Sequence, residues 1–226
     1  MFIIYKSGGE IRSMSNLTKY GWYALIVAIM GDILIPFILA PFYGGYSHMS
    51  MTISALVNPQ SPVRVIFNIW MLLEGLLFLS AIPAIYKYYN HVSKPLTVTV
   101  IVFTIIFAVG ACIFTCFFSV NETKDVVTTA SKIHGAGSVI GFMVFLFVPL
   151  LLSVLEFKNN YKANGVTALL SFIIAFLFFV LFVMSDKPEF SNTIIAKEGL
   201  WQRLNILFMY LPVGVVSVRN IFENRR

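Results

Sequence analysis

The chain has 226 residues, of which 58% are hydrophobic, 15% are aromatic and only 12% are charged. A soluble domain of this size cannot bury so much apolar surface, and the longest apolar stretches match the roughly 20 residues that cross a bilayer core about 30 Å thick. The formal net charge of +6 comes from basic residues scattered between these stretches and at both ends, which favours membrane orientation over a nucleic-acid partner. The short connections also exclude a separate soluble catalytic domain.

Six apolar stretches predict an all-α bundle of six transmembrane helices, at 21–39, 65–85, 96–118, 135–155, 166–184 and 200–218. Prolines inside these stretches are expected to kink the helices, because proline removes a backbone hydrogen bond; they are Pro36, Pro83, Pro149 and Pro212. Residues 1–20 are expected to be an unstructured cytoplasmic leader, with Met14 as an alternative start. The transmembrane domain covers 21–221, and 222–226 form a basic cytoplasmic tail.

The distribution of basic residues favours a cytoplasmic location for both termini in the plasma membrane. With the amino terminus inside, the cytoplasmic side holds ten of the 16 Lys and Arg residues: Lys6, Arg12, Lys19, Lys87, Lys94, Lys158, Lys162, Arg219, Arg225 and Arg226. The outer side holds the others: Arg64, Lys124, Lys132, Lys187, Lys197 and Arg203. Basic residues concentrate on the cytoplasmic side of membrane proteins, so this bias sets the orientation.

The longest connection, residues 40–62, is on the outer side in this topology and contains no Lys or Arg. Its apolar residues and its serines recur at helical spacing on two different faces: Met49, Ile53 and Leu56 on one, Ser47, Ser50 and Ser54 on the other. This pattern predicts a short amphipathic helix that lies across the outer mouth of the bundle.

Two acidic residues, Asp32 and Glu74, fall near the membrane midplane. At 1.5 Å per residue, Asp32 lies about 16 Å from the inner start of its span and Glu74 lies about 15 Å below the outer end of its span near Arg64. A charge at a span centre costs roughly 2.5 to 3.5 kcal/mol, and no Lys or Arg lies at that depth. The pair must therefore be protonated, share a proton, bind a cation or face a water-filled cavity. Proton or cation coupling is one interpretation; two protonated acids that join neighbouring helices are the other.

Polar side chains from four separate segments are expected at the outer ends of the spans. The candidates for ligand binding are His48, Arg64, Asn68, His134, Gln202 and Arg203. Such convergence beneath the amphipathic connection 40–62 predicts an outer pocket for a small or amphiphilic ligand. Taken singly, each residue has a simpler explanation, since an arginine at a span end extends to the lipid headgroups.

A hydrolase is the alternative function. Ser50, Thr52 or Ser54 in the outer connection would be a nucleophile that His134 activates, with an arginine to stabilise the developing negative charge. The substrate would be a lipid ester. The sequence has no G-x-S-x-G motif, and the hydroxyls also suit the wet face of an interfacial helix.

Metal and haem sites need more ligands than the three histidines supply. A bis-histidine haem on His48 and His134 is a further alternative, and a zinc site would also need Asp32 or Glu198. No metal site is therefore predicted, and the cofactor is left open. Gly137 and Gly141 form a G-x-x-x-G pattern that lets another helix approach closely, which favours packing within the bundle over an oligomer contact.

The run from Tyr46 to Leu56, followed by Ser61 and Pro62, resembles the first outer loop of bacterial membrane proteins known as the domain of unknown function 998 family. The segments 134–137 and 199–203 resemble the openings of two of its later spans. This resemblance covers most of the chain by span order and implies a six-span fold with no established activity.

A looser similarity is to the androgen-induced-type transmembrane threonine hydrolases, which act on fatty acid esters of hydroxy fatty acids. They use a threonine early in the chain and a histidine near the fourth span, and Thr52 and His134 are the nearest positions here. The similarity implies a hydrolase. The leading interpretation remains a membrane protein that binds or transports a small or amphiphilic ligand among membrane lipids.

Overall fold

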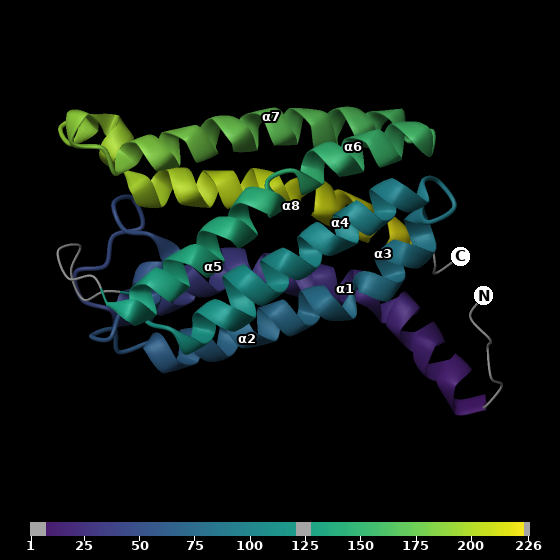
Figure 1. Cartoon of the computed structure of the whole chain (residues 1–226), viewed down its shortest axis with the longest axis horizontal. Coiled ribbons are helices and arrows are strands. Elements are labelled where there is room, and N and C mark those ends of the chain that lie inside the picture. Colours follow the sequence, from purple (N-terminus) through teal and green to yellow (C-terminus); the bar gives the residue numbers. More distant parts are fainter. Residues whose placement is uncertain (1–7, 121–127, 224–226) are drawn as a thin grey trace.

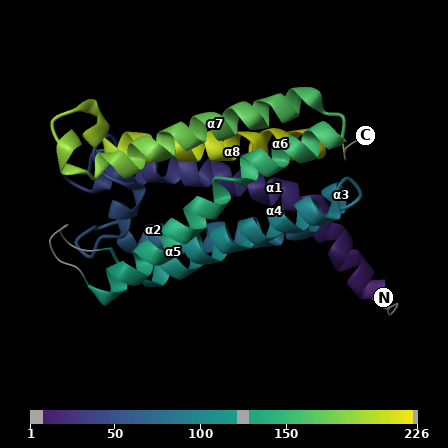
Figure 2. The same ribbon diagram turned by 45° about the horizontal axis from the view of Figure 1, so that its top comes forward.

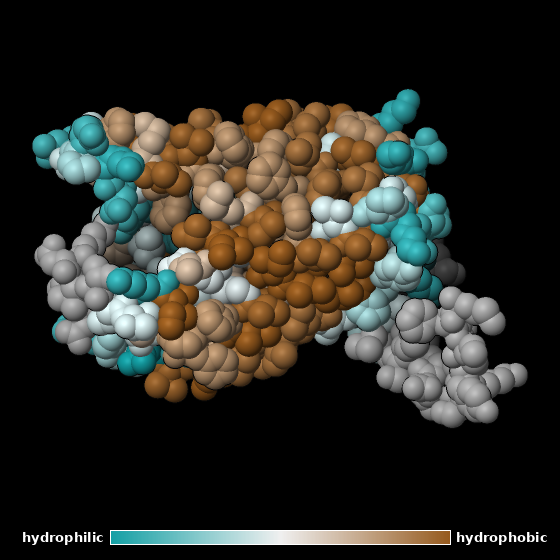
Figure 3. Space-filling model, viewed as in Figure 1, coloured by the Kyte–Doolittle hydropathy of each residue, from teal (hydrophilic) through white to brown (hydrophobic). Residues whose placement is uncertain are grey.

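The computed structural model describes residues 8–120 and 128–223, which form a bundle of helices (Figure 1). Six helical segments of this part are long and apolar enough to cross a membrane: Thr18–Phe42, Arg64–Tyr89, Lys94–Phe117, Thr129–Lys158, Lys162–Ser185 and Glu198–Glu223. The surface is apolar around the middle of the bundle and hydrophilic at its two ends, as a lipid-embedded protein requires (Figure 3). The predicted all-helical six-span fold is therefore confirmed.

The helices in chain order are α1 (Gly8–Leu39), α2 (Arg64–Ser80), α3 (Ile82–Tyr89), α4 (Lys94–Ile106), α5 (Thr129–Phe145), α6 (Val148–Lys158), α7 (Lys162–Ser185) and α8 (Glu198–Glu223). The described ends of the chain, at α1 and α8, lie at the same end of the bundle, here called the termini end (Figures 1 and 2). The opposite end carries the 40–62 connection, here called the flap, and is the flap end. Of the residues used for orientation, Lys6, Lys124, Arg225, Arg226 and the side chain of Arg12 lie outside the described part.

Part of the segment that was expected to be unstructured is helical, because α1 already begins at Gly8. No proline occurs before Pro36, so each residue added to the helix that starts the first span gains one backbone hydrogen bond. Helix α8 similarly continues to Glu223, beyond the expected start of the tail at residue 222.

Prolines interrupt two of the spans and leave two others continuous. The second span divides at Ala81, just before Pro83, and the fourth divides between Phe145 and Val148, just before Pro149. Helices α1 and α8 run through Pro36 and Pro212. The helix interruptions thus lie next to two of the four prolines at which kinks were expected, Pro83 and Pro149, whereas the helices are continuous at Pro36 and Pro212.

The third span changes from α-helix to π-helix, η3 (Phe107–Phe114), and ends in the short 3-10 helix η4 (Thr115–Phe117). Nothing in the sequence pattern predicted this change. The G-x-x-x-G pattern of α5 packs against η3, so the prediction of a contact within the bundle is confirmed. A Cβ atom at Gly137 would lie 2.7 Å from the carbonyl oxygen of Gly110, which leaves room only for glycine.

The flap does not contain the predicted amphipathic helix. Turns cover residues 44–45 and 48–50, and the only helical pieces are the 3-10 helices η1 (Ala40–Phe42) and η2 (Ile53–Val57). Tertiary contacts occupy the peptide groups that an α-helix would need: the Ile53 N–H donates to Gln202, and the carbonyls of His48 and Met51 accept from Arg203. The flap is therefore fastened to α8 instead of forming a separate helix.

A buried polar network that the sequence did not predict lies near the termini end. The carboxylate of Glu156 on α6 is fully buried and forms an ion pair with Arg219 of α8. It also accepts hydrogen bonds from Tyr89 of α3 (2.5 Å) and Asn164 of α7 (3.0 Å). Because a buried carboxylate needs partners on all sides, this one residue joins four helices.

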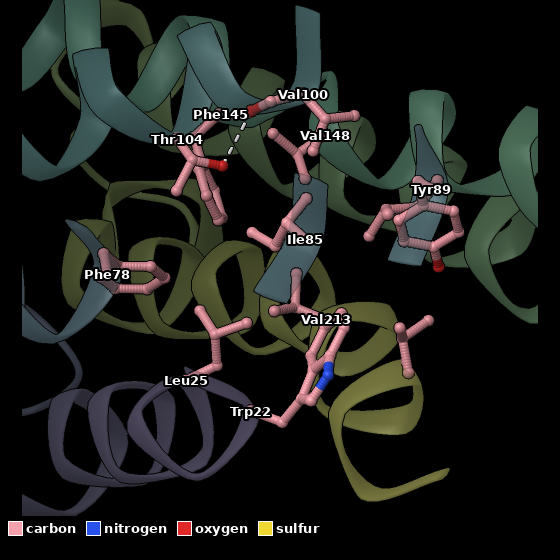
Figure 4. A pocket seen from close by; sticks show the side chains of 12 residues that line it. Trp22, Leu25, Phe78, Ile85, Tyr89, Val100, Thr104, Phe145, Val148 and Val213 are labelled. Atoms are coloured by element: carbon pink, nitrogen blue, oxygen red, sulfur yellow. Dashed lines mark hydrogen bonds between the residues drawn. The ribbon is translucent and has the colours of Figure 1, made fainter. Parts of the chain in front are cut away.

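Between this network and the centre of the bundle lies a small apolar cavity of about 20 Å³ (Figure 4). Trp22, Leu25 and Val213 line it, and the nearby Thr104 hydroxyl donates to the Val100 carbonyl of its own helix at 2.8 Å. The volume holds little more than one water molecule, and the wall offers no free polar group. This cavity is a packing void and does not suit a ligand.

Replacing Gly137 by alanine should destabilise the protein by about 1 to 3 kcal/mol, because the added methyl group meets a backbone carbonyl of η3 that cannot move away cheaply. The matched control is Gly135→Ala, where nothing lies within 4 Å of the added carbon. Thermal unfolding in detergent can be followed with a thiol-reactive dye, since both cysteines are buried. Equal melting temperatures for the two variants would contradict the tight α5–η3 contact.

Candidate functional site

A cavity of about 640 Å³ occupies the flap half of the bundle. Residues of α1, α2, η3, α5, α7, α8 and the flap contribute to its wall, which is mostly apolar. The polar wall residues include Asp32, Thr52, Glu74, His134, Ser138 and Gln202. Figure 3 shows the surface hollowed at this end, below the hydrophilic residues that follow α7. The volume is typical of a site for a small organic ligand.

The two acidic residues of the sequence analysis meet at one tyrosine. The Tyr210 hydroxyl of α8 lies 2.9 Å from Asp32 Oδ2 of α1 and 3.2 Å from Glu74 Oε1 of α2. A phenol has one proton, so it can donate to only one of the carboxyls; the other contact is a full hydrogen bond only when that carboxyl is protonated and donates to the phenol oxygen. The geometry therefore suits a pair of acids that holds one shared proton.

Packing fixes the position of this tyrosine. The Tyr210 ring is buried against Phe78, Phe107 and Phe145, with ring centres 5.9 to 6.3 Å apart. Cys112 of η3 lines the same cavity and lies close to Glu74. Because aromatic packing determines where the hydroxyl lies, the two carboxyls are held at a defined spacing.

His134 of α5 presents one nitrogen to the backbone and the other toward the cavity side. Its Nδ1 lies 2.8 Å from the Phe118 carbonyl oxygen and 3.2 Å from that of Thr115. Carbonyl oxygens only accept, so Nδ1 carries the proton and Nε2 is left with a lone pair. No described side chain hydrogen-bonds to Nε2.

The candidate nucleophiles divide into two groups. Thr52 and Ser54 line the cavity, and their hydroxyl oxygens lie 2.9 Å apart. Ser50 is exposed and does not belong to the cavity wall. Gln202 also lines the cavity, and it accepts a hydrogen bond from the Ile53 N–H at 2.7 Å, so it positions the flap.

Arg203 holds the flap and is absent from the cavity wall. Its Nη1 donates to the carbonyls of His48 (2.8 Å) and Met51 (3.1 Å), and its Nη2 donates to the Tyr46 hydroxyl (2.5 Å). The Tyr46 hydroxyl in turn donates to the Thr52 carbonyl at 3.0 Å. With most of its donors in use, the guanidinium orders the flap above the cavity.

Gly199, one turn before Arg203 on α8, allows this close contact. A Cβ atom at this position would lie 2.3 Å from the Met51 carbonyl oxygen and 2.6 Å from that of His48. Only glycine therefore lets α8 approach the flap backbone closely enough for the arginine to reach the carbonyls.

The other predicted ligand-binding residues do not reach the cavity. His48 stacks on the Phe37 ring at 4.4 Å; partial burial and the nearby charge of Arg203 lower the pKa of His48, so the imidazole is neutral at neutral pH. Arg64 and Asn68, on the first two turns of α2, are also absent from the wall. Within the described residues no three His, Cys, Asp or Glu side chains cluster as a metal site would require.

Tyr210 and most of the apolar wall were not predicted from the sequence. A tyrosine in the middle of a span, level with two acids, was a signal that could have been used. The contributions of Phe107 from η3 and of Phe179 and Phe182 from α7 carried no such signal, because lipid-facing and cavity-facing aromatics look alike in sequence.

Comparison with known proteins gave one match. The family model described as "Protein of unknown function (DUF998)" matches residues 26–219, which include parts of all six spans. No curated protein and no solved structure matched the chain. The similarity to the androgen-induced-type hydrolases is therefore not shown by any comparison.

Replacing Arg203 by methionine should release the flap, because several charge-assisted hydrogen bonds to its backbone disappear. Amide hydrogen exchange of residues 46–57, measured by mass spectrometry, should become about tenfold faster or more. Lys187→Met, which removes an exposed cation at the same end, is the control and should leave the exchange unchanged. Unchanged exchange in the Arg203 variant would contradict its role as the fastener of the flap.

Proposed function

The chain belongs to the family described as protein of unknown function (DUF998), a description that assigns no activity, and we propose that it binds and transports an amphiphilic molecule. It is a polytopic membrane protein, and we place it in the plasma membrane with the flap end outside. The observation that carries the proposal is the cavity of about 640 Å³, whose apolar wall ends at a buried carboxyl pair.

The chemistry of the wall supports an amphiphilic ligand. Phe67, Met71 and Phe142 offer apolar contact for a hydrocarbon chain, which gains roughly 0.8 kcal/mol for each buried CH₂ group. Polar groups occur at the two ends of the cavity, at the flap and at the carboxyl pair. A molecule with one polar end and an apolar body matches this distribution.

The space between α5 and α7 supports entry from the lipid. Val139 and Met143 of α5 and Val183 of α7 line the cavity, and each is about half exposed. The two helices diverge toward the flap end in both ribbon views (Figures 1 and 2). The divergence of α5 and α7 beside the cavity supports a sideways route by which a hydrocarbon chain enters from the bilayer.

Transport, as distinct from binding alone, is supported by the difference between the two halves. The cavity lies in the flap half, whereas the termini half is closed by packed apolar side chains and by the network around Glu156 and Arg219. This arrangement suits an outward-open state. Asp32 and Glu74 are the proposed coupling groups, since a pair that holds one proton can exchange it when a ligand arrives.

Filling the cavity should abolish saturable binding of an amphiphile. The probes are dansyl-labelled dodecyl chains with uncharged, cationic or anionic head groups, titrated against purified protein in phosphatidylcholine nanodiscs. Ser138→Trp, which fills the cavity, should weaken binding at least tenfold, while Val27→Trp on the lipid-facing surface of α1 should not. If no probe binds saturably, or if Ser138→Trp binds as tightly as the native protein, the proposal is wrong.

A hydrolase remains the second candidate, because Thr52 and Ser54 line the same cavity as His134 and its Nδ1–H tautomer leaves Nε2 available as a base. The substrate would be a lipid ester in the apolar cavity. An alkyl fluorophosphonate should then label the protein, and labelling should be lost in His134→Gln and in the Thr52→Val, Ser54→Ala double variant. Ser50→Ala is the control, and absence of such labelling would exclude this candidate.

A further inference from the structure

We infer that the ligand is a cationic amphiphile, whose ammonium or quaternary nitrogen lies beside Asp32 and Glu74 at the deep end of the cavity. This inference rests on the proposed function and names its substrate class. It follows from the charge of the cavity wall, from an unsatisfied carboxyl oxygen and from the aromatic side chains around the cavity.

The cavity wall is acidic. Asp32 and Glu74 contribute two carboxyls, whereas the described wall contains no Lys or Arg, and its one histidine, His134, lies on α5. The charge of Arg203 acts on Asp32, but the guanidinium is bonded to flap carbonyls. An anionic head group would therefore meet like charge in a low-dielectric site, and a cationic one would meet opposite charge.

One carboxyl oxygen is left without a partner. Tyr210 reaches Asp32 Oδ2, but no described residue donates a hydrogen bond to Asp32 Oδ1. The Asp32 side chain is only 7% exposed, and it lines the cavity. A carboxyl oxygen that has no donor from the protein and borders a cavity must be satisfied by something that the cavity admits: a water molecule, a cation or its own proton.

The aromatic side chains favour an organic cation over a metal ion. Phe67 of α2 and Phe107 of η3 line the cavity, and the faces of such rings attract ammonium groups. A bare divalent ion would need several more oxygen ligands than two carboxyls provide, and the surrounding wall is apolar. An alkylammonium ion needs no such ligand shell, and its chain is compatible with the apolar wall.

Protons should compete with this ligand for the same oxygens. The titratable groups that face the pair are the Tyr210 hydroxyl of α8 and the Cys112 thiol of η3, with His134 as the remaining one in the wall. Protonation of Asp32 and Glu74 removes the negative charge, and a protonated His134 would add positive charge. Both changes weaken the binding of a cation as the pH falls.

The test compares three dansyl-labelled dodecyl probes of nearly equal shape in nanodiscs: a trimethylammonium, its uncharged isostere with carbon in place of nitrogen, and a sulfonate. At pH 8 the trimethylammonium should bind at least tenfold more tightly than the isostere, and its affinity should fall between pH 8 and pH 5. In the Asp32→Asn, Glu74→Gln double variant this preference should disappear, while the isostere binds as before. Glu189→Gln, which neutralises an exposed acid of the flap end, should keep the preference.

The outcomes separate the two proposals. Equal binding of the trimethylammonium and the isostere, or tighter binding of the sulfonate, would overturn the cationic ligand and leave an amphiphile site in place. Failure of all three probes would overturn the proposed function itself. Unchanged isostere binding in the double variant shows that it is folded, so a lost preference reports charge and not damage to the cavity.

Discussion

Helix α8 supplies hydrogen-bonding partners at three depths of the bundle, and the arrangement of the other helices depends on them. Arg203 fastens the flap, Tyr210 joins the acids of α1 and α2, and Arg219 neutralises Glu156 of α6. Lipid offers no hydrogen bonds, so each polar group inside a span must find its partner within the protein. A shift of α8 would leave buried groups unsatisfied at all three depths.

These contacts make the two halves of the molecule different. At the termini end, the Glu156 network draws α3, α6, α7 and α8 together around one carboxylate. At the flap end α7 packs beside α8, whereas α5 packs against η3. Gly137 of α5 allows this close contact with η3. The cavity is the space that results where α5 and α7 part, so its existence follows from where the tight contacts are.

The sequence was sufficient for features that depend on local composition and depth. The six spans follow from apolar length, the helix ends before Pro83 and Pro149 follow from a missing donor, and the proximity of Asp32 and Glu74 follows from their equal depth. The sequence could not predict the π-helix or the irregular flap, because both depend on contacts with distant residues. Arg203, which the sequence suggested as a ligand-binding residue, lies outside the cavity wall, and its guanidinium donates hydrogen bonds to the flap backbone.

The sequence by itself determined an all-helical membrane protein with two acids deep in the bundle, because burial of charge and exposure to lipid are constraints on composition at each position. Only the tertiary structure decided which side chain hydrogen-bonds to each buried polar group. It also decided which apolar residues face the cavity and which face lipid. The physical reason is that an apolar or hydrogen-bonding side chain suits several surroundings equally well, as at Tyr210, Glu156 and Phe179. The packing of distant helices selects among them.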